Sequence, residues 1–475
     1  MQATASRTDN KTIAAATVRA LAEDFAGPII QPDDPGYEEA RQVWNGMIDR
    51  YPALIVQPET TADVVAAVNL ARERNLLLSV RGGGHHVAGH GTNDGGLVID
   101  LSRMSEVDVD PDRRLARVQG GATWAEVDRA TQAHGLATPG GVVSDTGIAG
   151  LTLGGGIGWL RNKYGLSSDN LVKAEVVTAA GKQIQASSKQ NRDLFWALRG
   201  GGGNFGVVTA FTYRLHPVAQ RQMFAFVFHH GRHAAAGLRF FRDYMAAAPD
   251  EVSALAFLGI VPPEEEIFPK AVRGERFIAF AAMYVGALEQ GRRVLKPLRD
   301  FSQPLIDFSQ PMPYIDIQQV LDEDYPAQEL RYYWKSLNLH HLDDQAIEQL
   351  VSQAEQQVSP FSTTDIWPMG GAVSRFPEEE SAFVGRQARF LLGVEANWED
   401  PATDDANIAW VRDVVAAMEP FSDGSQYLNF PGFHEEGQQM MKATFRHKYK
   451  RLAAVKRKYD PTNLFRLNHN IEPAE

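Results

Sequence analysis

Three glycine-rich runs in the first half of this 475-residue chain restrict its fold more than any other feature. They cover residues 82–89, 147–158 and 200–206. Because glycine has no Cβ, the N–H groups of such a run can approach an anion closely. The first run follows the apolar residues 76–80, which predict a strand that ends in a loop. The pattern therefore predicts backbone cradles for a phosphorylated group at the ends of secondary-structure elements.

The first run is extended by two histidines. Arg81 and three glycines are followed directly by His85 and His86. This order places an imidazole nucleophile beside a bound phosphorylated group. The alternative is a glycine-rich turn whose histidine merely packs, and the two further runs in order argue against it.

The third run contains the spacing of the dinucleotide fingerprint, through Gly201, Gly203 and Gly206. That fingerprint works when a strand precedes it and a helix follows, so that the helix N-terminus meets the diphosphate. Here residues 193–198 predict a helix before the run, and residues 207–215 predict a strand after it. The reversed order argues against a nicotinamide-binding site.

Composition excludes several classes of partner. The net charge is −12, from 47 basic and 59 acidic residues, which argues against nucleic acid and anionic membranes. No apolar run approaches the length of a membrane span. Residues 1–24 lack the apolar core of a secretory signal, so we expect a cytoplasmic protein. The basic run 446–458 is interpreted as the solvated face of one helix over residues 441–459.

The order of predicted elements indicates an α+β chain of two domains, because 475 residues exceed the size of one core. Residues 1–220 alternate short strands, helices and hairpins. Residues 221–424 predict longer apolar strands separated by amphipathic helices, which is typical of an antiparallel sheet backed by helices on one face. Residues 425–475 form a third segment with motifs of its own.

Taken together, the R-x-G-G-H run, the two further glycine runs, and the closing motifs at 426–430 and 460–471 resemble the berberine-bridge-enzyme-like flavoproteins of the vanillyl-alcohol-oxidase superfamily. The resemblance covers residues 51–217 and 427–471 well. It implies an FAD-binding domain over 1–220, a substrate domain over 221–424, and a C-terminal return to the FAD-binding domain over 425–475. It further implies bonding of His85 to the 8α carbon of the flavin, although the sequence leaves His86 as an alternative.

The resemblance also implies a set of flavin-binding residues from all three runs and from the closing motifs. These are Arg81, Gly82, Gly83, Gly84, His85, His86, Gly89, Thr146, Gly147, Gly150, Gly154, Gly155, Gly158, Asn204, Val208, Asn429, Asn468 and Asn470. Some relatives attach the flavin a second time through a cysteine. This chain has no cysteine, and Val143 occupies the matching position, so a single covalent bond is expected.

The chemistry implied is oxidation of a C–H next to O or N by hydride transfer to the flavin, while a base takes the O–H or N–H proton. Glu395 is the first candidate base, because a carboxylate on a central strand is costly without a partner or a role. Tyr427, in the closing motif, is the second. The structural alternatives are a solvent-facing edge-strand glutamate and a core tyrosine, and Asp169 is interpreted as a turn former.

The expected partners are a small alcohol, sugar or amine substrate and molecular oxygen or another electron acceptor. The rivals are a flavin dehydrogenase with poor oxygen reactivity and a flavin-binding protein without turnover. Adjacent histidines at 85–86, 229–230 and 340–341 invite a metal site, but neighbours on a strand point to opposite faces. We therefore expect no metal.

Overall fold

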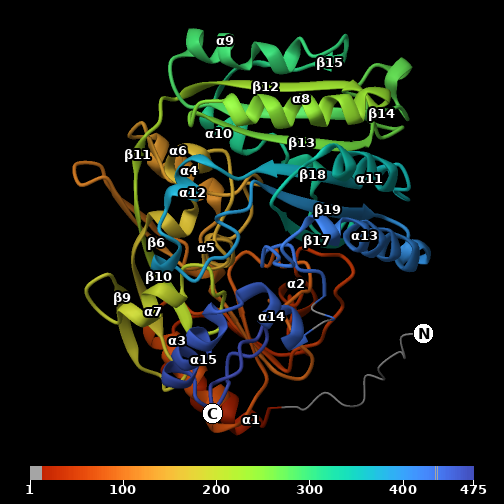
Figure 1. The fold of residues 1–475 in the computed structure, drawn as a ribbon. Coiled ribbons are helices and arrows are strands. Elements are labelled where there is room, and N and C mark those ends of the chain that lie inside the picture. Colours follow the sequence, from red (N-terminus) through yellow and green to blue (C-terminus); the bar gives the residue numbers. More distant parts are fainter. Residues whose placement is uncertain (1–12, 434, 436) are drawn as a thin grey trace.

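The computed structural model describes residues 13–433, 435 and 437–475. Residues 1–12, which belong to the segment 1–24 considered above for a secretory signal, lie outside the described residues. Figure 1 shows two halves stacked on each other, with a large sheet above and the N-terminal and C-terminal segments together below. The α+β, two-domain class expected from the sequence is confirmed. The exact division at residues 220 and 424 stays a prediction.

A small parallel sheet carries the first glycine run. Its strands lie in the order β1 (Ile29–Ile30), β2 (Leu54–Val56), β4 (Leu97–Asp100), β3 (Leu78–Arg81), with only β1 antiparallel. The helix α3 (Thr61–Glu73) connects β2 to β3. Thr60 and Asp63 cap it reciprocally, each side chain accepting from the other's backbone N–H at 3.2 and 2.9 Å. The first glycine run therefore begins where β3 ends.

A second, antiparallel sheet follows the third run and packs beside the second. It has the order β5 (Val107–Asp110), β6 (Leu115–Gln119), β10 (Val207–Arg214), β8 (Leu171–Val177), β9 (Gln183–Ser187). The helix α7 (Arg192–Ala197) precedes the third run and β10 follows it. This order is the reverse of a dinucleotide-binding unit, as predicted. Shorter elements complete this half: α1 (Ala15–Ala22), α2 (Tyr37–Ala40), α4 (Trp124–Gln132), β7 (Leu136–Ala137), α5 (Ile148–Leu153), α6 (Arg161–Tyr164) and β11 (His216–Pro217).

The second half is one large antiparallel sheet. Its order is β15 (Pro304–Asp307), β12 (Arg221–His230), β14 (Arg276–Tyr284), β13 (Val252–Ile260), β18 (Thr363–Pro368), β19 (Phe390–Trp398), β17 (Arg331–Leu339), and β16 (Gln310–Pro313) also pairs with β12. Four helices pack their apolar stripes on one face: α8 (Ala234–Ala247), α9 (Leu288–Arg299), α11 (Asp344–Ala354) and α13 (Asp404–Met418). The opposite face is turned toward the first half (Figure 1). Two short helices, α10 (Tyr314–Gln318) and α12 (Gly371–Arg375), lie in its connections.

Strand alternation decides which side chains reach that opposite face. On β19, Leu392, Val394 and Ala396 pack against the helices, whereas Leu391 and Glu395 point the other way. Strand alternation therefore places Glu395 on the inner side of the sheet. A solvent-facing glutamate is not what the structure shows, since Glu395 is buried on a central strand.

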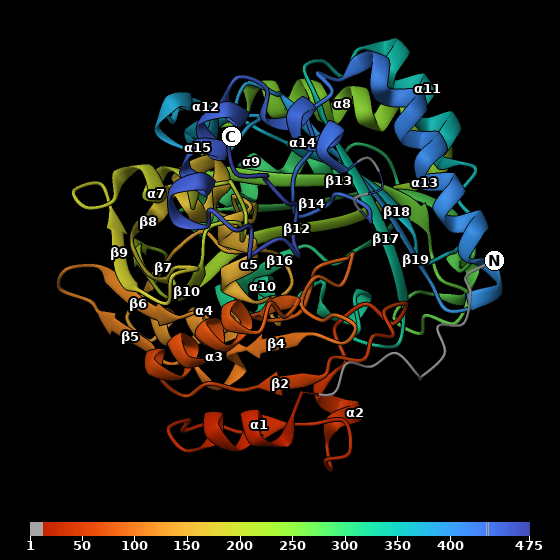
Figure 2. The same cartoon turned by 90° about the horizontal axis from the view of Figure 1, so that it is seen from below.

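The C-terminal segment crosses back to the first half, and Figure 2 shows α15 beside α7. The single helix expected over 441–459 is wrong: α14 (Gly437–Phe445) and α15 (Lys448–Tyr459) are separated at Arg446, whose φ is 49°. Its basic side chains are not all solvated either. The Lys456 ammonium is buried and donates to the carbonyls of Asn204 and Phe465 and to Asp460, which fastens the C-terminus to the third glycine run.

None of the helices within the described residues is both long enough and apolar enough to span a membrane. A cytoplasmic location stays a prediction.

Candidate active site

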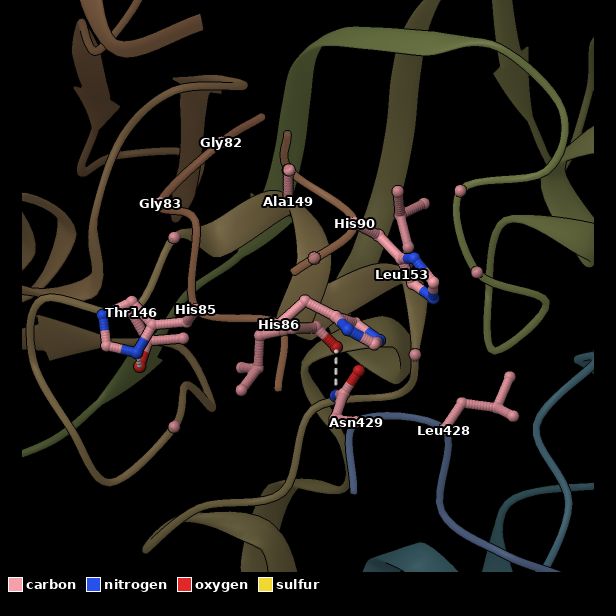
Figure 3. A pocket seen from close by; sticks show the side chains of 18 of the residues that line it. Gly82, Gly83, His85, His86, His90, Thr146, Ala149, Leu153, Leu428 and Asn429 are labelled. Atoms are coloured by element: carbon pink, nitrogen blue, oxygen red, sulfur yellow. Dashed lines mark hydrogen bonds between the residues drawn. The ribbon is translucent and has the colours of Figure 1, made fainter. Parts of the chain in front are cut away.

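One cavity lies between the two halves, and all three glycine runs line it together with residues of the large sheet and of the C-terminal segment. Figure 3 shows part of its wall. Most of the residues predicted from the sequence line it: Arg81, Gly82, Gly83, Gly84, His85, His86, Thr146, Gly147, Gly150, Gly154, Val208, Glu395, Tyr427, Asn429 and Asn468.

Five predicted residues lie outside the cavity wall and have structural roles. Gly89 adopts a φ of 65° against Ile48, Gly155 packs on Phe383, and Gly158 approaches the Gly140 carbonyl. Asn204 is buried and binds the closing segment, donating to the His469 carbonyl and accepting from the Ile471 N–H. The Asn470 carbonyl accepts from Gln438, while its side-chain Oδ1 has no partner among the described residues.

The first two glycine runs contact each other backbone to backbone. A Cβ on Gly83 would lie 2.3 Å from the Gly147 nitrogen, and a Cβ on Gly147 would lie 2.2 Å from the Gly83 nitrogen. Several glycines of the second run also leave room for side chains of other segments. For example, a Cβ on Gly154 would lie 2.1 Å from Oδ1 of Asn429. Close packing therefore accounts for much of that run.

The His85 ring is held from three directions. Its Nε2 lies 3.0 Å from Oδ1 of Asp145, its Nδ1 lies 3.4 Å from Oγ1 of Thr146, and its face stacks on Trp44 with ring centroids 5.1 Å apart. Because a carboxylate accepts hydrogen bonds, Asp145 places the ring hydrogen on Nε2 and leaves a lone pair on Nδ1. Asp145 and Trp44 escaped the sequence reasoning, since neither belongs to a motif.

His86 points away from His85 (Figure 3) and joins a different group. It shares a hydrogen bond of 2.7 Å with His469 from the closing segment, and His90 lies beside both rings. The three imidazoles are close enough to share an ion, a constellation that the sequence-adjacent pairs did not suggest. However, Nδ1 of His86 accepts from the Ala88 N–H, so its Nε2 carries the hydrogen that a metal would have to displace.

Arg81 lines the cavity, but its guanidinium is already engaged. It pairs with Asp100 at 2.9 Å and donates to the carbonyls of Gln42 and Ala40. Both side chains of the pair are buried, at 7% and 6% exposure. Arg81 thus fixes the end of β3 and the start of the glycine run.

The large sheet contributes a pair of buried carboxyls to the cavity. Glu395 on β19 and Asp365 on β18 lie within hydrogen-bonding range of each other, and the Tyr325 hydroxyl donates to Glu395 at 2.8 Å. Burial raises the pKa of Glu395 well above its ordinary value, and the charge of Asp365 raises it further. The sequence pointed to Glu395 alone, because Asp365 is thirty residues away in the chain and meets it only through strand pairing.

Tyr427 lies at the other side of the same cavity. Its hydroxyl accepts from the Ile157 N–H at 3.3 Å and from the Asn429 amide at 2.8 Å. Burial raises the pKa of Tyr427 to about 12. Of the two candidate bases, Glu395 is therefore the better acceptor near neutral pH.

The residues present fit an extended cofactor that carries a diphosphate. The glycine runs expose backbone amides, and apolar side chains of β3 and of the closing segment line the same cavity. Oδ1 of Asn468 is buried there and has no hydrogen-bond partner among the described residues, so it is available to a ligand. This arrangement is that of a flavoprotein oxidoreductase.

Comparison with known proteins identifies the family. Residues 52–187 match the model of an FAD binding domain, and residues 426–472 match the model described as berberine and berberine like. An uncharacterised FAD-linked oxidoreductase of Bacillus subtilis is 30% identical over 457 residues, covering 94% of this chain and 97% of the relative. An FAD-linked oxidoreductase of Dictyostelium discoideum is 30% identical over 462 residues, covering 96% and 97%.

Among solved structures, 6-hydroxy-D-nicotine oxidase from Arthrobacter nicotinovorans superposes with a TM-score of 0.84 at 28% identity, covering 95% of this chain and 98% of that one. The chain belongs to the berberine-bridge-enzyme-like FAD-linked oxidoreductases. It is an enzyme, and its cofactor is FAD.

Proposed function

We propose that this enzyme oxidises a small alcohol, sugar or amine at a C–H next to O or N, with the flavin attached covalently through His85 and with oxygen as the electron acceptor. One observation carries the proposal: the histidine at the end of the glycine run and a buried carboxyl on the large sheet line the same cavity. A nucleophile for the cofactor and a base for the substrate therefore flank one space.

The hydrogen bonds of His85 support attachment through Nδ1. Asp145 accepts the hydrogen on Nε2, so the lone pair lies on Nδ1, the atom that bonds to the 8α carbon in this proposal. His86 is the weaker candidate, because both of its ring nitrogens are already engaged, by Ala88 and His469.

Glu395 is the proposed base. A flavin held in this cavity would supply the hydride acceptor for the substrate carbon. The ionised Glu395 takes the proton from the neighbouring O–H or N–H, and the Tyr325 hydroxyl holds Oε2 in place. Leu391, Trp334 and Phe430 line the surrounding wall and limit the access of water to this carboxyl.

Acid precipitation of the purified protein tests the attachment. The expected result is a yellow pellet from wild type and from His86→Ala, and a colourless pellet from His85→Ala. A yellow pellet from His85→Ala, or a wild type whose flavin stays entirely in the supernatant, would show the assignment to be wrong.

Anaerobic reduction followed by admission of air tests the reaction. A substrate that bleaches the flavin, with recovery of colour and formation of hydrogen peroxide in air, is the expected outcome. Bleaching with recovery only on addition of a quinone or dye acceptor would instead identify a dehydrogenase. Failure of a broad panel of alcohols, sugars and amines to bleach the flavin would indicate flavin binding without turnover.

A further inference from the structure

The carboxyl pair on the large sheet gives information about the substrate that the family does not provide. Asp365 on β18 lies opposite Gly393 on β19, and Glu395 lies two residues further along the same face. A Cβ on Gly393 would lie 3.4 Å from Oε1 of Glu395 and 3.5 Å from Cβ of Asp365. The absence of a side chain at Gly393 thus leaves the space in which the two carboxyls meet.

Two buried carboxylates in contact cannot both be ionised at low cost. Burial raises the pKa of Asp365 and of Glu395. The pair consequently retains at least one proton near neutral pH, so that its ionised form presents a single negative charge to the cavity. The Tyr325 hydroxyl donates a hydrogen bond to Glu395. By contrast, Oδ1 of Asp365 accepts no hydrogen bond from an N–H or O–H among the described residues.

No lysine or arginine balances this charge within the part of the cavity lined by described residues of the large sheet and its connections. That part consists of Leu255, Leu321, Tyr325, Trp334, Asp365, Trp367, Leu391 and Glu395. Arg161 lies behind it, 5.4 Å from the Trp367 ring, and donates to the carbonyls of Gly158, Ala254 and Pro368. Lys335, on the strand beside Glu395, alternates to the opposite face of the sheet.

Aromatic rings form the remaining wall. Trp334 lies edge-on to Tyr325 and to Phe430, each with centroids 5.4 Å apart, and the three rings surround the approach to Glu395. Ring faces attract cations, and a desolvated carboxylate does so more strongly. A neutral sugar would bring many hydroxyls into a wall that offers mainly rings and leucines.

We propose that the Asp365–Glu395 pair, within this aromatic wall, recognises a substrate that carries an ammonium group next to the C–H that is oxidised. This inference rests on the proposed function and narrows its substrate class to amines. Asp365 is assigned as the positioning residue that shares the proton of Glu395.

The proton and electron balance is simple. The ammonium N–H proton passes to the ionised carboxyl of the pair, which leaves both carboxyls protonated and the nitrogen with a lone pair. The adjacent C–H bond then breaks with its electron pair as hydride, which the flavin accepts, and the substrate becomes an iminium ion. Water hydrolyses that ion to a carbonyl compound and an amine.

Spectral titration of the oxidised, flavin-loaded protein tests the charge preference. Benzylamine and benzyl alcohol are matched in shape, and trimethylphenylammonium provides a cation without an N–H proton. At about pH 7 we expect benzylamine to bind at least about ten-fold more tightly than benzyl alcohol. Equal or tighter binding of the alcohol, or no saturable response to either cation, would overturn the proposal.

Variants identify the source of the preference. Asp365→Asn/Glu395→Gln removes the charge and should abolish the preference, whereas Asp128→Asn, a buried carboxyl outside the cavity, should retain it. Flavin content and circular dichroism verify that each variant is folded and loaded. A preference that survives in the double variant would show that the pair is not the recognition element.

The single variant Asp365→Asn tests proton sharing. One carboxyl remains to ionise, so the preference for benzylamine should persist, but the pH at which it appears should shift, because Glu395 no longer shares a proton with a second carboxyl. An unchanged midpoint would remove Asp365 from the proposal. If the wild-type flavin is reduced by an alcohol or sugar and by no amine, this inference fails while the proposed function stands.

Discussion

The backbones of Gly83 and Gly147 touch, so that neither residue has room for a Cβ: each virtual methyl would lie within 2.3 Å of the other's nitrogen. This contact joins the end of β3 in the parallel sheet to the start of α5 beside the antiparallel sheet. His85 and Thr146 flank it and face each other at 3.4 Å. His85, the proposed attachment residue, thus lies beside a contact between two glycine runs that the sequence separates by more than sixty residues.

Gly83→Ala or Gly147→Ala should separate the two runs. We expect a loss of about 1–3 kcal/mol in the free energy of unfolding from overpacking, together with a lower flavin content. Thermal unfolding and the ratio of visible to protein absorbance measure both effects. Gly370→Ala is the control, because nothing lies within 4 Å of its virtual Cβ and its φ of −165° suits any residue. Equal behaviour of all three variants would contradict this account.

Asp145→Ala should slow covalent attachment without unfolding the protein. Without the acceptor on Nε2, the His85 ring loses the hydrogen bond that keeps the lone pair on Nδ1, and we expect attachment at least about ten-fold slower. The Asp145 side chain is 55% exposed, so stability should stay within about 0.5 kcal/mol. Asp145→Asn retains an oxygen acceptor and should restore part of the rate. Acid-stable flavin after timed incubation of apoprotein with FAD gives the rates.

Arg386→Met should destabilise the junction of the two halves. Asp169 caps the turn at Leu166, as the sequence suggested, but it also binds Arg386 through both carboxylate oxygens at 2.5 and 3.0 Å, with both side chains almost fully buried. Removing one partner leaves an uncompensated buried charge, which typically costs about 3–5 kcal/mol. Denaturant unfolding measures this loss. Asp169→Asn/Arg386→Met should lose less than Arg386→Met alone, and a larger loss would argue against a charge effect.

The carboxyl pair should make wild-type stability fall as pH rises. A raised pKa means that the folded state holds a proton that the unfolded chain releases above about pH 4, so stability is greatest below that pH and declines until the folded pKa is passed. As the pH rises, the free energy of unfolding of Asp365→Asn/Glu395→Gln should therefore increase relative to that of wild type. The increase should be about 1.4 kcal/mol per pH unit for each proton that the folded wild-type pair retains. Denaturant unfolding between about pH 5 and about pH 8 tests the sign. A stability difference independent of pH would show that the pair is ionised normally.

Of the two carboxyls in the cavity, one could be identified from the sequence and the other could not. Glu395 could be singled out from the sequence, because a carboxylate within an apolar strand is a local signal. Nothing local marks Asp365, whose strand β18 was not identified from the sequence, and the pairing of β18 with β19 alone brings it to Glu395. Asp145 and Trp44 likewise meet His85 through loops that are far apart in the chain and that only the folding of the first half brings together.

The C-terminal helices were predicted incorrectly from the sequence. The basic run 446–458 gave no signal of a break, yet the chain turns at Arg446, and Lys456 is buried against the third glycine run. By itself, the sequence determined the α+β class, and it predicted the glycine runs as a cradle, His85 as the attachment residue and Glu395 as a base, because each of these follows from local residue order. The tertiary structure decided which glycines pack against each other, which nitrogen of His85 faces Asp145, and which carboxyl lies beside Glu395, because these depend on distances between segments far apart in the chain.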